Sequence, residues 1–440
     1  MGSGSSIRRA GLQERASGEK PRRWSTGSAD LRPPSIAVPP RGGRFSFRAW
    51  TAGKGHGHGE DLVTVVPNGS EAPPRRSLGK VDSDDPSTPD LSPSRSSSKR
   101  PSGLHPMQIP RQRIEMADLQ TSMREARKEV SQWNPKDYVF GKVLAKSLAN
   151  HGQVDLMQKT SGGGSYAVKR MPNSWVQSGP GEFALKHPKE KERPWCDVGM
   201  LRILEDVQYP FLCKLQGIFR DGKQTYVCTE LAEGGELLAW MRTCSSPASP
   251  DREHQIVHVA SDICLAIRSL HDLGIVHRDI SPENIVLTKN EEVKIIDFGM
   301  ATIGRICLDD GCGKDAYQAP ESSSSKMYDG FLADVFATGV TLFAMAVGDL
   351  PWQKTGADGC PMFAIASEHG IRSFMQQSTL RGGQTTLTEV LSKELLDTIA
   401  GLMDFDPKQR LCLGEACYAD GTAGHRVSAW EKLWLSYELT

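Results

Sequence analysis

The sequence predicts an α+β protein whose folded part follows a disordered tail. Two short apolar runs, Gly274–Val276 and Val293–Ile296, have the length of buried strands and enclose a polar loop. The longest apolar run, Val335–Val347, predicts a buried core helix, because threonines interrupt it and it is too short to span a bilayer. Residues 1–113 are rich in Ser, Pro, Gly and Arg, and such a segment cannot bury enough apolar surface to offset its chain entropy.

The tail and the rest of the chain carry opposite charge. Residues 1–113 hold 19 Lys and Arg against 10 Asp and Glu, whereas the formal net charge of the 440-residue chain is zero. A basic tail therefore precedes an acidic folded part. We expect no nucleic-acid partner.

The start of the tail fits a lipidation pattern. Glycine at position 2 and serine at position 6 match the signal for N-myristoylation. One acyl chain anchors weakly, and the arginines that follow would add electrostatic attraction to a membrane. We therefore expect peripheral membrane contact through Gly2 and the basic tail. The alternative is that this Gly/Ser start arises by chance and the tail is only a linker.

The cysteines indicate a reducing compartment. All ten lie between Cys196 and Cys417 without a tight paired framework, and a chain of this length needs no disulfide staples. With no secretory signal in view, we expect a cytoplasmic protein with reduced thiols. Zinc binding by Cys307, Cys312, Cys412 and Cys417 is the alternative that we favour less.

A helical extension is expected between the tail and the folded part. Apolar or part-apolar residues recur at near-helical spacing from Glu115 to Trp133, and Pro135 ends the pattern. We expect residues 1–114 to form the disordered tail and residues 115–136 to form an extension helix that packs on the folded part.

The most informative motif begins at His277. The sequence His-Arg-Asp-Ile-Ser-Pro-Glu-Asn occupies 277–284, and Asp-Phe-Gly follows at 297–299. In this order and spacing the two motifs resemble the catalytic loop and the metal-binding motif of eukaryotic protein kinases. The resemblance implies a bilobal fold, with a small β-rich N-lobe at 137–232 and a larger helical C-lobe at 233–440. The Ser281-Pro282-Glu283 pattern favours the Ser/Thr type.

The resemblance assigns roles in phosphoryl transfer. Asp279 would orient the substrate hydroxyl, and Asn284 and Asp297 would hold Mg²⁺ against the phosphates of ATP. Lys169, in Tyr-Ala-Val-Lys, would hold the α- and β-phosphates. Other motif positions are structural in the family: Ala319-Pro320-Glu321, Asp334 and Arg410.

The nucleotide-binding residues are only partly conventional. Of the three glycines usual in the phosphate-covering loop only Gly152 is present, with Val154 at the adenine-capping position. The resemblance places Glu230 and Ala232 in the hinge, where their backbone groups would bind adenine, and Glu236 at the rim. We expect weakened ATP affinity, because glycines let backbone amides approach phosphates closely.

Two further departures concern charges. The position that pairs with Lys169 aligns with Asp197, one methylene shorter than the usual glutamate, and Glu192 is the fallback partner. Serine/threonine kinases usually have a lysine two residues after the catalytic aspartate and a threonine facing it. Here these positions are Ser281 and Lys314, so we expect the cation to have moved to Lys314. The alternative is a solvent-facing Lys314 in a weakened enzyme.

Substrate preference and activation follow from acidic positions. Glu236 and Glu283 match positions where basophilic kinases, of the cAMP-dependent and calcium-dependent-like types, pair with arginines upstream of the phosphoacceptor. Asp310 stands where the activating phosphate would face Arg278, which predicts activity without that phosphate.

The sequence therefore predicts a serine/threonine protein kinase that uses ATP and Mg²⁺ on protein substrates in basic contexts. The alternative is a pseudokinase that keeps the fold as a nucleotide-binding or scaffold module. The altered glycine loop and Ser281 motivate this alternative. Four residues that phosphoryl transfer needs argue against it because they are present together: Lys169, Asp279, Asn284 and Asp297.

Overall fold

The computed structural model describes most of the chain after the basic tail. The described residues are 45–46, 113–128, 130–146, 152–245, 248–308, 311–324, 327–356, 360–380 and 385–418. The predictions on Gly2, on the basic tail apart from residues 45–46 and 113–114, on the tip of the phosphate-covering loop (Ser147–His151) and on Asp310 lie outside these residues. In the tail predicted to be disordered, Phe45–Ser46 form a short strand and the Ile114 N–H bonds to the Leu273 carbonyl.

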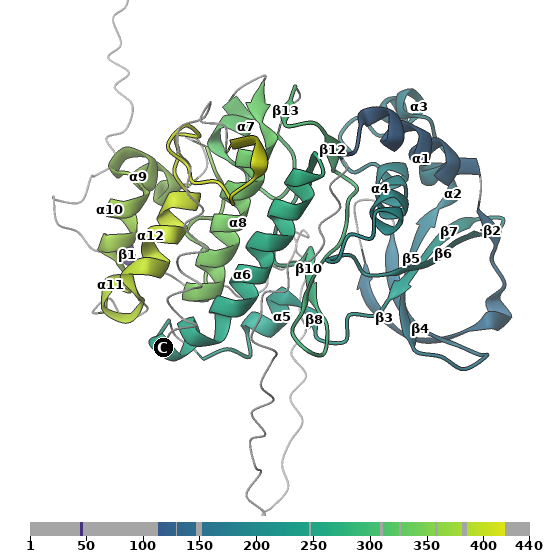
Figure 1. The fold of residues 1–440 in the computed structure, drawn as a ribbon, viewed down its shortest axis with the longest axis horizontal. Coiled ribbons are helices and arrows are strands. Elements are labelled where there is room, and N and C mark those ends of the chain that lie inside the picture. Colours follow the sequence, from purple (N-terminus) through teal and green to yellow (C-terminus); the bar gives the residue numbers. More distant parts are fainter. Residues whose placement is uncertain are drawn as a thin grey trace, which may run out of the picture. The chain divides into compact units, whose positions relative to one another are not determined.

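A six-stranded sheet forms the small lobe (Figure 1). Its order is β2-β6-β7-β5-β4-β3, with all neighbours antiparallel except the parallel pair of β2 and β6. Alternation explains these strands, since inward residues such as Val168 are fully buried while their neighbours are partly exposed. The strands are β2 (Ser131–Gln132), β3 (Tyr138–Lys146), β4 (Gln153–Lys159), β5 (Ser165–Pro172), β6 (Leu215–Arg220) and β7 (Gln224–Glu230).

Helices complete the small lobe. The principal one is α4 (Pro194–Asp206), and the residues of its first two turns are buried. The shorter α2 (Asn173–Val176) and α3 (Pro180–Lys186) precede it. Helix α1 (Met116–Lys128) packs against α4, as Figure 1 shows.

The extension helix is shorter than the sequence predicts. It ends at Lys128, and β2 and the 3₁₀ turn η1 (Pro135–Asp137) occupy the rest of the predicted span. The reason lies at Trp133, whose ring stacks between Tyr226 at 4.1 Å and Tyr138 at 4.8 Å. The aromatic residue thus serves the sheet instead of a helix face.

The large lobe is helical. Helices α6 (Pro250–Asp272) and α8 (Gly330–Val347) run side by side through its core (Figure 1). Side-chain caps fix where both begin: Ser249 accepts from the Arg252 N–H, and Asp329 accepts from the backbone of α8. Surrounding helices are α5 (Leu237–Met241), α7 (Pro320–Ser324), α9 (Pro361–His369), α10 (Ile371–Gln377), α11 (Leu387–Val390) and α12 (Lys393–Leu402).

Short strands carry the loops of the large lobe. The predicted strands are confirmed as β9 (Ile275–Val276) and β11 (Val293–Ile295), both with buried inward residues. Strand β10 (Ile285–Leu287) pairs with β11 and with β8 (Gly235–Glu236), while β9 pairs with β12 (Thr302–Ile303). The remaining short elements are β1 (Phe45–Ser46) with β15 (Ser378–Thr379), β13 (Ile306–Cys307) with β14 (Tyr328–Asp329), and the 3₁₀ turn η2 (Ala416–Tyr418).

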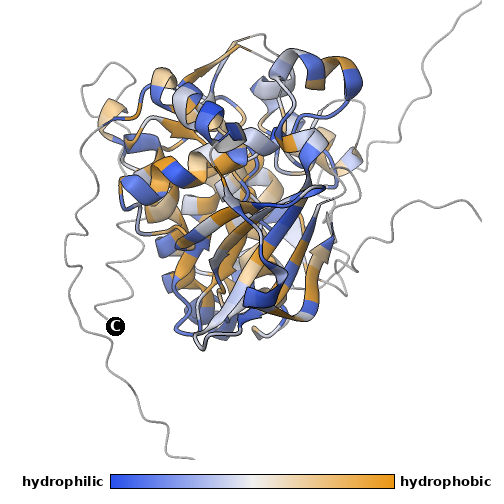
Figure 2. Cartoon of the chain, turned by 90° about the vertical axis from the view of Figure 1, so that its right-hand side faces the viewer, coloured by the Kyte–Doolittle hydropathy of each residue, from blue (hydrophilic) through white to orange (hydrophobic). Residues whose placement is uncertain are grey.

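The predicted core helix is confirmed as α8. Its 18 residues would suffice in length and composition for a membrane span, but 94% of that window is buried inside the fold. This burial is what a core helix of the large lobe requires. Elsewhere in Figure 2, helices and strands carry hydrophobic (orange) and hydrophilic (blue) residues together, as elements with one buried side do.

Candidate active site

Asp334 of α8 holds the backbone of the His-Arg-Asp loop. Its two carboxylate oxygens accept hydrogen bonds from the N–H groups of His277 at 2.7 Å and Arg278 at 2.8 Å. Arg278 adopts a positive φ of 70°, a costly conformation for a non-glycine residue that these bonds help to maintain. The loop is therefore rigid on the side that faces the core.

His277 ties this loop to the Asp-Phe-Gly segment. Its Nε2 donates to the carbonyl of Ile296 at 3.1 Å, and its Nδ1 accepts from the N–H of Asp279 at 3.3 Å. In these two bonds Nε2 is the donor and Nδ1 the acceptor. His277 is thus a structural link between the motifs.

Asp279 gathers the polar groups of the site around its carboxylate. Asn284 donates from Nδ2 to Asp279 Oδ2 at 2.7 Å and to the Asp279 carbonyl at 2.8 Å. Lys314 donates to Asp279 from its backbone N–H at 3.1 Å and from Nζ at 3.4 Å. Only 13% of the Asp279 side chain is exposed, so these donors largely enclose the carboxylate.

Lys314 and Ser281 meet as the sequence predicts. Lys314 Nζ donates to Ser281 Oγ at 2.7 Å, and Ser281 is fully buried. The ammonium group of Lys314 therefore lies beside Ser281, the position where serine/threonine kinases usually have a lysine. A solvent-facing Lys314, the alternative, does not fit these contacts.

Gly313 makes this approach geometrically possible. Its φ is +89°, and a Cβ there would lie 2.6 Å from the carbonyl oxygen of Arg278 and 3.1 Å from Asp279 Oδ1. A side chain would push the segment away from the loop, so only glycine allows Lys314 to reach Asp279.

Lys169 lies among three carboxylates. Its Nζ is 2.8 Å from Asp197, 3.2 Å from Asp297 and 3.6 Å from Glu192. Burial lowers the pKa of Lys169, but Asp197, Asp297 and Glu192 outweigh it and hold that pKa well above its usual range. Asp197 of α4 and Glu192 in the loop before it, the two partners considered from the sequence, thus both reach the lysine, and Asp197 is the nearer.

Asp197 also fixes the Asp-Phe-Gly segment. Its Oδ1 accepts from the N–H of Phe298 at 3.0 Å, while Oδ2 faces Lys169. The shorter aspartate therefore spans both partners because α4 stands close to them. Phe298 itself is fully buried.

Asn284 and Asp297 form the donor set suited to a hard cation. The carbonyl of Asn284 accepts from the N–H of Ile296 at 3.0 Å, which brings Asn284 beside Asp297. Burial raises the pKa of the Asp297 carboxyl, but Lys169 outweighs it and lowers that pKa, so the group is ionised at neutral pH. Amide and carboxylate oxygens suit Mg²⁺, which is usually held by one or two carboxylates and substrate phosphates.

The described part of the chain contains no cluster of three or more His, Cys, Asp or Glu side chains arranged to bind a metal. The zinc alternative for the four cysteines therefore lacks a geometric basis there. A site completed by phosphate oxygens does not need such a cluster.

The nucleotide-binding positions lie around Lys169. Val154 pairs with Lys169 across β4 and β5, and Gly152 is buried just before β4. The Glu230 N–H donates to the Lys214 carbonyl at 2.9 Å, so this residue would offer adenine its carbonyl. The Ala232 carbonyl accepts from Gly235 at 3.1 Å, so Ala232 would offer its N–H.

Glu236 and Glu283 are close enough to interact. Partial burial raises the pKa of the Glu236 carboxyl, and the neighbouring Glu283 adds to the rise, whereas Arg242 and Lys314 oppose it. The two carboxylates repel each other; the Glu236 side chain is exposed, whereas one carboxylate oxygen of Glu283 is buried. A cation between them would relieve this repulsion.

A buried ion pair closes the activation segment onto the large lobe. Arg410, which is fully buried, donates to Glu321 at 2.5 and 3.0 Å in a bidentate pair. Arg410 also donates to the carbonyls of Leu332 and Asp404, at 2.8 Å each. Its structural role follows from this satisfied network.

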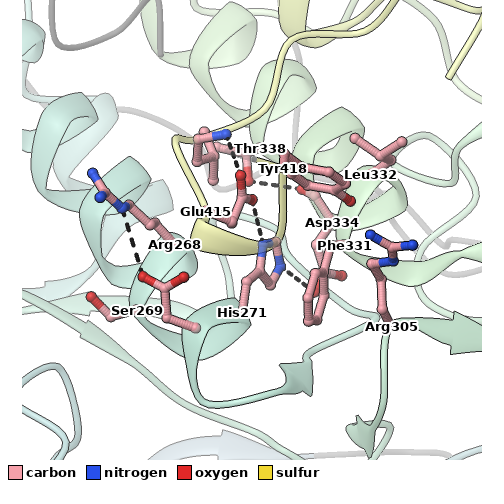
Figure 3. Close-up of polar contacts among 12 residues, drawn as sticks. Arg268, Ser269, His271, Arg305, Phe331, Leu332, Asp334, Thr338, Glu415 and Tyr418 are labelled. Carbon is pink, nitrogen blue, oxygen red and sulfur yellow. Dashed lines mark hydrogen bonds and ion pairs between the residues drawn. The ribbon is translucent and has the colours of Figure 1, made fainter. Parts of the chain in front are cut away.

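Figure 3 shows a second buried cluster of charged side chains, which the sequence did not indicate. His271 at the end of α6 lies 2.7 Å from Glu415 and 3.3 Å from Asp334, and its ring stacks on Phe331. Burial lowers the pKa of His271, but the two carboxylates outweigh it and raise that pKa to about 9. Glu415 lies in a loop without any motif, so no local signal could have identified it.

Proteins of known families resemble this chain over its folded part. The family model described as "Protein kinase domain" matches residues 151–420. Serine/threonine-protein kinase GIN4 of Saccharomyces cerevisiae is 29% identical over 269 residues, which are 60% of this chain and 22% of that protein. The cAMP-dependent protein kinase catalytic subunit of Arthrobotrys oligospora is 29% identical over 259 residues, 58% of this chain and 46% of that protein.

A third relative is CBL-interacting protein kinase 11 of Oryza sativa subsp. japonica. It is 30% identical over 221 residues, which are 48% of this chain and 39% of that protein. The chain thus spans between about a fifth and a half of the length of these relatives.

Proposed function

The chain belongs to the protein kinase family, and from this premise we propose that it transfers the γ-phosphate of ATP to serine and threonine hydroxyls of proteins. The observation that carries the proposal is the position of Lys169. It contacts Asp197 of α4 at 2.8 Å and Asp297 at 3.2 Å, so the lysine, the helix and the metal-binding aspartate are assembled together.

The residues divide the work of phosphoryl transfer. Asp279 orients the attacking hydroxyl and accepts its proton, and Lys314 stabilises the charge that develops on the transferred group. Lys169 holds the α- and β-phosphates. Mg²⁺ held by Asn284 and Asp297 would neutralise charge on the β- and γ-phosphates.

We propose that the substrates carry a basic residue about three positions before the phosphoacceptor. The support is the pair of carboxylates Glu236 and Glu283. Burial raises the pKa of Glu236, the neighbouring Glu283 raises it further, and an arginine between them would relieve their repulsion.

A peptide assay tests both proposals together. Wild-type protein should transfer ³²P from ATP to an Arg-x-x-Ser peptide, and Asp297→Ala should reduce transfer to background. The Glu236→Gln variant should raise KM for this peptide roughly tenfold, in the range of one charge-assisted pair, and leave KM for an Ala-x-x-Ser peptide unchanged.

The controls separate the two claims. Equal peptide KM values for wild type and Glu236→Gln would remove the basic preference but keep the kinase. Transfer no greater than that of Asp297→Ala, over a panel of peptides, would replace the kinase with the pseudokinase alternative, a nucleotide-binding or scaffold module.

We also propose that the protein works in the cytoplasm with a membrane-bound fraction anchored by Gly2. The support is the Gly2–Ser6 pattern and the basic tail, which together provide the two weak signals that anchoring needs. Intact-mass analysis of protein from eukaryotic cells should show one myristoyl group, and Gly2→Ala should move the bound fraction to the soluble one. An unmodified mass would contradict the anchor.

A further inference from the structure

Helix α4 is held from behind by the segment Arg113–Trp133. Ser122 of α1 donates from Oγ to the Gly199 carbonyl at 2.8 Å. A Cβ on Gly199 would lie 2.8 Å from Cγ and 3.0 Å from the backbone N of Met123. The backbone of α4 at Gly199 therefore packs directly against Met123 of α1. Only glycine permits the two helices to approach this closely.

Gly199 and Asp197 face opposite ways. Residues two apart on a helix point roughly 200° apart around its axis. Asp197 faces Lys169 and the Phe298 N–H, so Gly199 faces α1. The contact with α1 therefore lies on the side of α4 opposite to Asp197.

The segment is fastened at both of its ends as well. At the start, the Ile114 N–H donates to the Leu273 carbonyl at 2.9 Å, in the turn that leads into β9 and the catalytic loop. At the other end, β2 pairs with β6 and the Trp133 N–H donates to the Arg220 carbonyl at 2.8 Å. The segment thus contacts the large lobe, α4 and the sheet edge.

Burial along α1 supports this arrangement. Ile114 and Leu119 are 4% and 2% exposed and belong to the main core, and Ser122 is 7% exposed. Most other side chains of α1 whose exposure is described face solvent. The buried side of α1 therefore faces α4. The helix is packed against the fold and is not merely tethered to it by the chain.

We propose that Arg113–Trp133 is a positioning strap that sets α4, and through it Asp197, for nucleotide binding without a partner protein. This inference rests on the proposed kinase function and identifies Ser122 and Gly199 as positioning residues. The strap makes the Lys169–Asp197 pair a property of the single chain.

Two glycines in helices allow a matched test. Gly199→Ala introduces a methyl group against Met123, whereas Gly181→Ala, in α3, introduces one into open space. Alanine favours a helix wherever its methyl group has room. In the full-length protein, Gly199→Ala should weaken binding of Mg²⁺ and AMP-PNP about tenfold. It should also speed amide exchange in both α1 and α4, and Gly181→Ala should do neither.

A double-mutant cycle tests the route through Asp197. If the strap acts by placing Asp197, the loss of AMP-PNP affinity from Gly199→Ala should largely vanish in an Asp197→Asn background, because the residue it positions is already disabled. A purely structural role would give additive losses. Additive losses, or equal behaviour of Gly199→Ala and Gly181→Ala, would overturn the proposal.

A milder pair covers the case in which Gly199→Ala does not fold. Ser122→Ala removes the hydroxyl that bonds to Gly199, and Thr121→Ala removes an exposed hydroxyl next to it. Only Ser122→Ala should speed exchange in α4 and weaken AMP-PNP binding, and identical effects would contradict the strap. Neither readout requires phosphate transfer, so a chain without kinase activity would refute the proposed function and still test the strap.

Discussion

Replacing Lys314 by alanine is expected to lower turnover roughly a hundredfold or more, with little change in KM for ATP. Lys314 Nζ lies 2.7 Å from Ser281 Oγ and 3.4 Å from Asp279 Oδ2, the carboxylate proposed to orient the reacting hydroxyl. The charge it supplies matters most in the transition state, so kcat should suffer more than ground-state binding. Steady-state kinetics on the Arg-x-x-Ser peptide measures the loss.

The rescue experiment identifies which position needs the cation. Ser281→Lys in a Lys314→Thr background should recover part of the lost turnover, because it returns the lysine to the position usual in the family. Lys314 is 36% exposed, so thermal unfolding should change little and the loss cannot be assigned to instability. Turnover near that of wild type in Lys314→Ala would show that the cation has no catalytic role.

His271 is expected to make the stability of the fold fall steeply as pH rises from 6.5 towards 9. Its pKa is raised to about 9 in the folded protein from 6.5 in the unfolded chain. Because the folded state holds the proton more tightly, the stabilisation is fully present below pH 6.5 and is lost as pH rises through 9. The loss should be on the order of 3 kcal/mol in the free energy of unfolding.

The acidic groups around His271 support this sign. Asp334 and Glu415 contact it directly, and Asp272 and Asp329 also feel its charge. Burial raises the pKa of Glu415, but His271 outweighs it and lowers that pKa. The histidine is therefore the cation of a buried acidic cluster, and deprotonation leaves two carboxylates to repel each other.

A second histidine on the same helix provides the control. His258 is 28% exposed and contacts a single carboxylate, Glu291, at 3.2 Å. Denaturant unfolding measures the free energy of unfolding at each pH between 6.5 and 9. The decrease of this free energy with rising pH should persist in His258→Gln and be mostly lost in His271→Gln. An NMR titration of His271 with a midpoint near 7 would contradict the prediction, whatever the stability of the variants.

The local motifs could be predicted because each consists of a few consecutive residues whose types alone indicate a strand or a reactive loop. The runs around the catalytic loop have the length and apolarity of buried strands, and they form β9 and β11. Lys314 and Ser281 could be paired only because the family resemblance places these two positions opposite each other. Their contact depends on Gly313, whose φ of +89° has no periodic signature.

Other features depend on contacts that no local pattern records. Glu415 is 144 residues from His271 in sequence, and Ser122 is 77 residues from Gly199. The extension helix was predicted too long because Trp133 fits both a helix face and an aromatic stack. The stack is favoured because Tyr138 and Tyr226 come from separate strands that fold against it.

The two edges of the small-lobe sheet also bear on whether a strand of another copy could pair with it. Strand β2 covers one edge with only two residues, and β3 ends the sheet on the other side among the described residues. On β3, Val139 and Phe140 are 54% and 55% exposed, which would suit an incoming strand from another copy. Irregularities in its pairing with β4 and the exposed Lys142 and Lys146 make the edge uneven and charged. Those are the devices by which natural sheets resist edge-to-edge aggregation, so a lobe with an open strand can remain dispersed at high concentration.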